Sequence, residues 1–356
     1  MLVTDMKAHW LLILVLFALS PARTFAEEIP AKPAATNLTV APYLRITDST
    51  NGTIELQVAI RRLAPKEDKG TELLLAAVTH IGETNYFTNL QKQMARYELV
   101  LFEGIMPAKR SKGAWTGKEF ETIRSMSAQE DAEAGNLQVE LARALKLAFQ
   151  LSAISYDKPN YRNSDLSVEA MQRILMGPPS KGPAKPAPEG QERGDESLTK
   201  LMQLMQGEGF LGKLVIMGVQ IIASNPHLQA VTKLTFVETL GRVRGDLAKA
   251  HAMPPELARL FEVIIHSRNQ KVVDDVIDEL RKKSPPKSIA VFYGAGHMDD
   301  LERRLREELN YKPKGDTWLP ALKVDLKEGG ISKFQLQMIR FMVQQQMRML
   351  FPEEQK

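Results

Sequence analysis

Two histidines and one glutamate in this sequence each follow a short apolar run. His80 comes after the run LLLAAV, His297 after IAVFYG, and Glu103 directly after LVLF. Apolar runs of this length are typical of strands buried on both faces of a parallel sheet. Ligands of open α/β sheets bind beyond the carboxyl ends of such strands. We therefore expect His80, Glu103 and His297 to converge at one edge of a sheet.

This set of residues suits the chemistry of a divalent metal ion. Two neutral imidazoles and one carboxylate are ligands that first-row divalent metals accept, and an open position would hold a water molecule as the nucleophile. The chain has no cysteine, which excludes Fe–S clusters, thiol catalysis and cysteine-based zinc sites. We expect His80, Glu103 and His297 to bind the ion. The alternative for each is a hydrogen-bonded structural role.

The two histidines also share a local pattern. His80 stands three residues after Ala77, and His297 three residues after Gly294, so a small residue precedes each histidine at the same spacing. A helix is predicted after each. The repetition indicates two pseudo-symmetric units, each made of a strand, a (G/A)xxH motif and a helix.

Three further residues are candidates for supporting roles. Glu83 is a candidate catalytic base, metal ligand or partner of His80, although a first-turn residue that complements the helix dipole is the better interpretation. Arg268 and Asn269 are candidates to neutralise or hydrogen-bond a substrate carboxylate or oxyanion, with a surface helix turn as the alternative.

Other polar residues have simpler interpretations. The segment 161–165 (YRNSD) favours turn and N-cap chemistry ahead of a helix that starts near Ser167. His227 and His251 lie in polar, helical surroundings and are expected at the surface.

The strands that must position the histidines and Glu103 are predicted from patterning. Thr53 to Leu63 alternates apolar and polar residues, and with Asn37 to Ile46 and the turn at Asn51-Gly52 it predicts an N-terminal β-hairpin. Buried strands are expected at 71–78, 99–102 and 287–292, and a last strand at 322–326. A helix over 84–97 joins the first two buried strands, so the fold class is α/β with a partly parallel central sheet.

A large helical insertion separates the two halves of that sheet. Residues 115–176 and 197–283 are predicted to be helical, with breaks at 156–163, 224–226 and 254–255. Between them, 177–196 is rich in proline and glycine and is expected to form a disordered linker. The apolar stretch 214–223 is too short to span a bilayer and predicts a core helix. Residues 331–351 form an amphipathic C-terminal helix that packs on the core or pairs with a second copy.

The N-terminus has the layout of a secretory signal. Lys7 precedes a ten-residue apolar run, and Thr24 and Ala26 place small residues before Glu27. We expect cleavage after Ala26 and a periplasmic or extracellular protein; the alternative is an uncleaved membrane anchor. With 47 basic and 43 acidic residues, the net charge of +4 is too small to predict nucleic-acid binding. The chain therefore divides into a signal peptide (1–26), a β segment (27–70), an α/β domain (71–330) and a C-terminal helix (331–356).

Taken together, these segments resemble the TraB/PrgY/GumN family. The resemblance covers about residues 70–310 and is carried by the His80 motif, LVLFEG, IIHSRN and above all PPKSIAVFYGAGHMDDLERRL. That family is related to the TIKI metalloproteases and, more distantly, to erythromycin-esterase-like and ChaN-like proteins. Its mark is a pair of Gly-x-x-His motifs with a glutamate between them. The first motif departs from this pattern, because Ala77 replaces the glycine.

The resemblance implies a divalent-metal-dependent peptidase that acts on a peptide or protein. It implies manganese or cobalt, with zinc also compatible with the ligand set. It makes His80, Glu103 and His297 metal or catalytic residues, with Arg268 and Asn269 as supporting groups. Two alternatives stay open. One is a non-catalytic protein that binds a peptide, a metal or haem, and the other is a metal-free esterase with a histidine base.

Overall fold

The computed structural model describes residues 40–67, 69–109, 113–134, 137–176, 209–243 and 261–351. The structural statements below concern these residues alone. The signal segment, the linker 177–196 and His251 lie outside them, as does the break predicted at 254–255.

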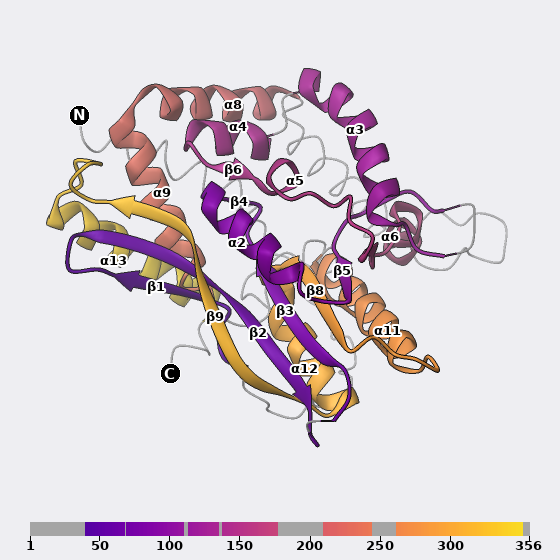
Figure 1. Ribbon diagram of the computed structural model, residues 1–356. Coiled ribbons are helices and arrows are strands. Elements are labelled where there is room, and N and C mark those ends of the chain that lie inside the picture. Colours follow the sequence, from indigo (N-terminus) through magenta and orange to yellow (C-terminus); the bar gives the residue numbers. More distant parts are fainter. Residues whose placement is uncertain are drawn as a thin grey trace, which may run out of the picture.

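A mixed seven-stranded sheet organises the described part of the chain (Figure 1). Its order is β1-β2-β3-β8-β5-β7. β1 and β3 pair with different halves of one edge of β2, and β9 pairs along the opposite edge. The strands are β1 (Leu44–Asp48), β2 (Thr53–Pro65), β3 (Glu72–Val78), β5 (Leu99–Phe102), β7 (Tyr161–Asn163), β8 (Ser288–Gly294) and β9 (Tyr311–Asp325). The pairs β3–β8, β8–β5 and β5–β7 are parallel, whereas the pairs made by β2 are antiparallel. The α/β class and the partly parallel sheet are thus confirmed.

Helices cover both faces of the parallel half. α2 (Thr84–Met94) packs on one face, and α11 (Arg268–Leu280) and α12 (Met298–Leu309) pack on the other (Figure 1). The apolar runs of β3, β5 and β8 are buried because both faces are covered. The predicted strand–helix–strand unit β3-α2-β5 is confirmed, and β8 enters the sheet between its two strands.

The antiparallel half differs from the prediction in two places. In the described residues the first strand starts at Leu44, and the last strand starts at Tyr311 instead of Leu322. Its missed first half, Tyr311–Thr317, is largely exposed and carries Lys312, Pro313 and Lys314. Lysine and proline are common on edge strands, where they discourage pairing with another chain. Because they are not apolar, this part of the strand gives no apolar pattern in the sequence.

The alternation of apolar and polar residues along β2 predicts that Arg61 lies on the polar face, yet Arg61 is fully buried. Its guanidinium donates to Glu302 of α12 at 2.7 Å and to Asp316 of β9 at 2.7 and 2.8 Å. The Tyr43 hydroxyl donates to the same Glu302. The packing of α12 over this end of the sheet therefore turns an outward position into a buried ion network.

The helical insertion is more broken than the sequence predicts. Its described elements are α3 (Gly117–Ala134), α4 (Leu137–Ala144), α5 (Gln150–Ala153), α6 (Val168–Met176), α8 (Gly209–Ser224), α9 (Pro226–Leu240) and the π-helical turn η2 (Glu262–Ser267). A two-stranded sheet, β4 (Ile81–Gly82) with β6 (Ala148–Phe149), ties it to the end of β3. The break at Asn225 is confirmed, and Asn225 caps α9 through its side chain.

The predicted core helix at 214–223 lies within α8 and is buried on one face only. Val215 and Val219 pack against α4, whereas Met217 and Ile221 are 52% and 57% exposed. Among the described helices none alone is long and apolar enough to cross a membrane; α8 and α9 satisfy that test only as a pair bent by 115°.

The C-terminal helix is confirmed as α13 (Lys333–Leu350). It begins with a capping box at Ser332 and Gln335 and packs against α9. Val343 and Met347 are buried in this contact, and Phe334 and Phe341 are exposed. Core packing therefore accounts for part of its apolar face, and pairing with a second copy stays a prediction.

Candidate functional site

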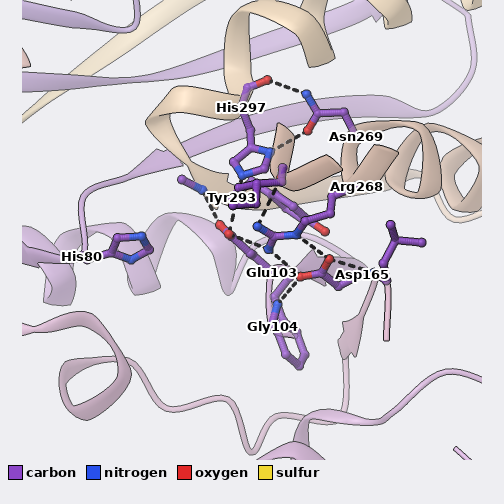
Figure 2. A network of polar contacts seen from close by, with 12 residues as sticks. His80, Glu103, Gly104, Asp165, Arg268, Asn269, Tyr293 and His297 are labelled. Atoms are coloured by element: carbon purple, nitrogen blue, oxygen red, sulfur yellow. Dashed lines mark hydrogen bonds and ion pairs between the residues drawn. The ribbon is translucent and has the colours of Figure 1, made fainter. Parts of the chain in front are cut away.

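The carboxyl edge of the parallel strands gathers most of the predicted residues (Figure 2). Glu103 directly follows β5, His297 closes the short helix η3 (Ala295–His297) after β8, and His80 follows β3. His297 Nε2 lies 3.6 Å from Glu103 Oε1. His80 makes no direct contact with either, although its ring points toward the Glu103 carboxylate (Figure 2). In the described residues, no three histidine or carboxylate side chains form an assembled metal-binding group.

Glu103 is held from two directions. Its Oε1 accepts a hydrogen bond of 2.7 Å from Arg268 Nη2, and its Oε2 accepts one of 2.7 Å from the Gly294 N–H. A Cβ atom on Gly294 would stand 3.3 Å from the same Oε2, so glycine permits the close approach of backbone to carboxylate. An ionised carboxylate has about four acceptor positions, and these two bonds leave lone pairs on both oxygens.

Asp165 holds Arg268 in place. The guanidinium donates from Nε at 2.8 Å and from Nη2 at 2.7 Å to its two carboxylate oxygens. Asp165 also accepts from the N–H groups of Gly104 and Leu166, at 2.9 and 2.8 Å. Arg268 is only 4% exposed and orients Glu103 through its hydrogen bond, and its contact with a substrate stays a prediction.

Asp165 was not predicted as part of the site. It was assigned to turn and N-cap chemistry, whereas the residues before it form β7 at the edge of the sheet. A strand of three residues with a single core side chain, Tyr161, gives no apolar pattern, and β7 is recognised only by its parallel pairing with β5. The signal that sequence analysis could have used is an aspartate just beyond a strand, on the same edge as Glu103.

Asn269 fixes the orientation of the His297 ring. Its Nδ2 donates to His297 O at 3.1 Å and to Asp300 Oδ2 at 2.9 Å, which turns its Oδ1 toward His297 Nδ1 at 2.7 Å. Nδ1 therefore carries the proton and donates it to Asn269, and Nε2 presents a lone pair toward Glu103. Asn269 is fully buried, so it positions the histidine and does not reach a substrate.

Gln150 fixes the orientation of the His80 ring in the same way. The Gln150 Nε2 donates to the Tyr156 hydroxyl at 3.0 Å, and its Oε1 lies 3.0 Å from His80 Nδ1. The backbone N–H of Gln150 also donates to His80 O at 2.8 Å, next to the β4–β6 ladder. His80 Nδ1 is thus the protonated nitrogen. Sequence analysis missed both Gln150 and Tyr156, because a buried glutamine in a helical insertion carries no local signal.

Charges around the site determine the protonation of its members. Burial alone would raise the pKa of Glu103, but the positive charge of Arg268 and, to a smaller extent, His297 and His80 hold it well below its ordinary value. Burial lowers the pKa of His297 to about 4, against the opposing influence of Glu103. At neutral pH the site therefore contains an ionised carboxylate and a neutral imidazole.

Two predicted positions lie elsewhere. Glu83 sits at the start of α2 and faces α9, where Lys233 Nζ lies 3.5 Å from its carboxylate, so it is not brought to Glu103. This position agrees with its helix-start interpretation, and a catalytic role for Glu83 stays a prediction. His227 is half-buried between α9 and the turn before α13, with Nδ1 2.8 Å from Gly329 O, which corrects the surface placement.

Comparison with known proteins adds no assignment: no family model, curated protein or solved structure matches this chain. The family resemblance therefore stays a prediction, and the case for a function is carried by the geometry of the site.

Proposed function

We propose that this protein is an exported, metal-dependent hydrolase that cleaves peptide bonds, with His80, Glu103 and His297 as the residues that bind a divalent ion. The observation that carries the proposal is the matched pair of amide contacts. Asn269 Oδ1 and Gln150 Oε1 each accept from the Nδ1 of one histidine. Metal-binding histidines characteristically donate one ring N–H to a neighbouring acceptor, which leaves the other nitrogen free as a ligand.

The spacing of His297 and Glu103 fits this proposal. With metal–ligand distances of about 2.0–2.2 Å and tetrahedral angles, two ligands of one ion stand about 3.4 Å apart. The 3.6 Å between His297 Nε2 and Glu103 Oε1 is close to that separation and is too long for a hydrogen bond. Nε2 also has no proton to donate, so the two atoms are acceptors that face one another. Such a pair is stabilised by a cation or a proton donor between them.

The other residues prepare the site. When bound, a divalent ion would supply Lewis-acid activation of water or of a substrate carbonyl. Arg268 holds Glu103 ionised and in one orientation, and Asp165 holds Arg268. The ionised Glu103 keeps acceptor positions on both oxygens for a water molecule or its proton. His80 is exposed and approaches from the side of the helical insertion, where a substrate would enter.

The finer features of the fold belong to the same proposal. We assign β3–His80–α2 and β8–His297–α12 as two copies of one pseudo-symmetric unit. In the parallel β3–β8 pair, Val78 aligns with Gly294, so the two motifs are offset by one residue. The proposal includes membership of the TraB/PrgY/GumN family, a domain over 71–330 interrupted by a large helical insertion, and export through the N-terminal signal.

The decisive experiment is elemental mass spectrometry of the purified full chain. Near-stoichiometric manganese, cobalt or zinc is expected in the wild type and is expected to disappear in a folded His80→Ala/His297→Ala variant. The matched control is His227→Ala, which removes an imidazole that does not contact Glu103 and should retain the metal. Equal metal content in the wild type and the double variant would refute the proposed ligands.

The ion pair of Glu103 with Arg268 supports a second candidate, a metal-free hydrolase. If Glu103 serves only as the partner of Arg268, His80 is left as the base, because Gln150 holds its Nδ1 and its Nε2 is free to accept a proton from water. Hydrolysis that survives exhaustive chelation, and is lost in His80→Gln, would select this candidate.

A further inference from the structure

A cavity of about 350 Å³ lies beside the Glu103 site, beyond the carboxyl ends of β5 and β7. It shares one residue with the site, because Asp165 lines the cavity and also binds Arg268. α11 connects the two regions as well. Arg268 faces Glu103, and Lys271 and Asp275, one and two turns further along this helix, line the cavity. A molecule bound across Glu103 can therefore extend into the cavity along the same edge of the sheet.

The walls of the cavity are partly apolar. Met106 and Leu166 contribute aliphatic surface, and Trp115 contributes an aromatic ring. Ile105, between Gly104 and Met106 in the chain, is 45% exposed, which is unusual for a large apolar side chain close to a buried polar site. Met106, Leu166 and Trp115 offer contact area to an apolar guest, and an aromatic side chain gains most from such surroundings.

The charges that line the cavity compensate one another. Lys271 lies 2.5 Å from Asp275, and Asp165 is paired with Arg268. Lys109 lies 2.8 Å from Glu119, beside the Trp115 ring. Each cation of the described lining thus already has a carboxylate partner. A charged guest would lose its hydration without gaining a counterion, so the cavity favours a neutral one.

Asn163 adds one specific polar group. Its Nδ2 donates to Gly104 O at 2.8 Å, and within the described chain nothing donates to its Oδ1. Asn163 lines the cavity, so this acceptor is available to a guest bound there. A guest that supplies an O–H or N–H can donate to it.

We propose that this cavity binds the side chain of a tyrosine residue of a peptide substrate, with the phenol hydroxyl donating to Asn163 Oδ1. Tyrosine combines a neutral aromatic body with one donor at its end, which matches the walls, the charge balance and the free acceptor. The identification of this peptide as a substrate rests on the proposed function. The preference of the cavity for tyrosine does not, because it depends only on binding.

The test measures binding of N-acetyl-L-tyrosinamide to the full chain by saturation-transfer NMR, without added metal. N-acetyl-L-phenylalaninamide lacks the donor and should bind about tenfold more weakly, which corresponds to the loss of one hydrogen bond. The α-amide of N-acetyl-L-aspartic acid, whose side-chain carboxylate is charged, should bind more weakly still. Ala114→Phe places a ring at the cavity lining and should abolish binding, whereas Ala108→Phe, at an exposed alanine outside the lining, should not.

The proposal is overturned if tyrosinamide does not bind the wild type, if the phenylalanine or aspartate amide binds equally well, or if Ala114→Phe and Ala108→Phe behave alike. These outcomes are distinct from a failure of the proposed hydrolase. Tyrosine binding in a protein without metal or hydrolytic activity would preserve the cavity assignment and remove the catalytic one. Metal-dependent hydrolysis that is indifferent to Ala114→Phe would do the reverse.

Discussion

Acidification should destabilise this protein through His297 before it affects the carboxylates of the site. His297 is 4% exposed, and burial lowers its pKa from 6.5 to about 4. In the unfolded chain the same imidazole takes up a proton near pH 6.5. Between these two pKa values the unfolded state binds more protons than the folded state, so the free energy of unfolding falls as the pH decreases.

The magnitude follows from the two pKa values. The difference of about 2.5 pKa units is worth about 3 kcal/mol once the pH is below both values. At pH 5 the loss attributable to His297 is about 2 kcal/mol relative to pH 8. Glu103 and Asp300 contribute little in this range. Their pKa values are lowered in the folded state, so the stability that they provide is lost only as the pH falls below their unfolded values of about 4.

Urea unfolding at pH 8 and pH 5, in the presence of a chelator, measures this loss directly. His297→Gln should reduce the difference between the two pH values by about 2 kcal/mol compared with the wild type. His227→Gln, which removes an imidazole far from Glu103, should keep the wild-type difference. If the wild type and His297→Gln lose equal stability on acidification, His297 is not held neutral by burial, and the assignment of Nε2 as a free lone pair fails with it.

Three other substitutions test the contacts around Glu103. Asn269→Leu removes the acceptor for His297 Nδ1 and should weaken metal binding about 10- to 100-fold, measured by cobalt titration of the folded variant; unchanged affinity would contradict the positioning role. Arg268→Met leaves the carboxylates of Glu103 and Asp165 unpaired and should cost about 3–5 kcal/mol in urea unfolding, whereas a loss below about 1 kcal/mol would show that the ion pair contributes little. Gly294→Ala should lower metal content with little effect on folding, because its Cβ would stand 3.3 Å from Glu103; a variant that unfolds would assign Gly294 to the core instead.

The sequence predicts the strands of the site well and their supporting contacts poorly. β3, β5 and β8 are apolar runs buried on both faces, and such runs are recognisable without knowledge of the fold. β7 and the first half of β9 are not, because β7 is only three residues long and the first half of β9 is an exposed edge. A strand of this kind is specified by its partner in the sheet, and that partner is distant in sequence.

The residues of the site divide in the same way, into those that follow recognisable strands and those that do not. Glu103 and His297 follow strands that sequence patterning identifies, so their meeting is predictable from topology. Gln150 and Asp165 reach the site through the β4–β6 pair and through β7, which depend on tertiary pairing alone. The structure brings Arg268 and Asn269 to Glu103 and His297, and it adds what the sequence does not show, namely that both are buried and already hydrogen-bonded.

The charges around Glu103 explain the role of the amide side chain that contacts each histidine. A histidine next to an ionised carboxylate normally gains a proton, because the negative charge favours the imidazolium form. Here burial of His297 and the positive charge of Arg268 oppose that gain, and Asn269 directs the one remaining ring proton away from Glu103. Gln150 does the same for the tautomer of His80. Asn269 and Gln150 thus each leave the other ring nitrogen of one histidine free to act as a ligand, as the proposed cation-binding site would require.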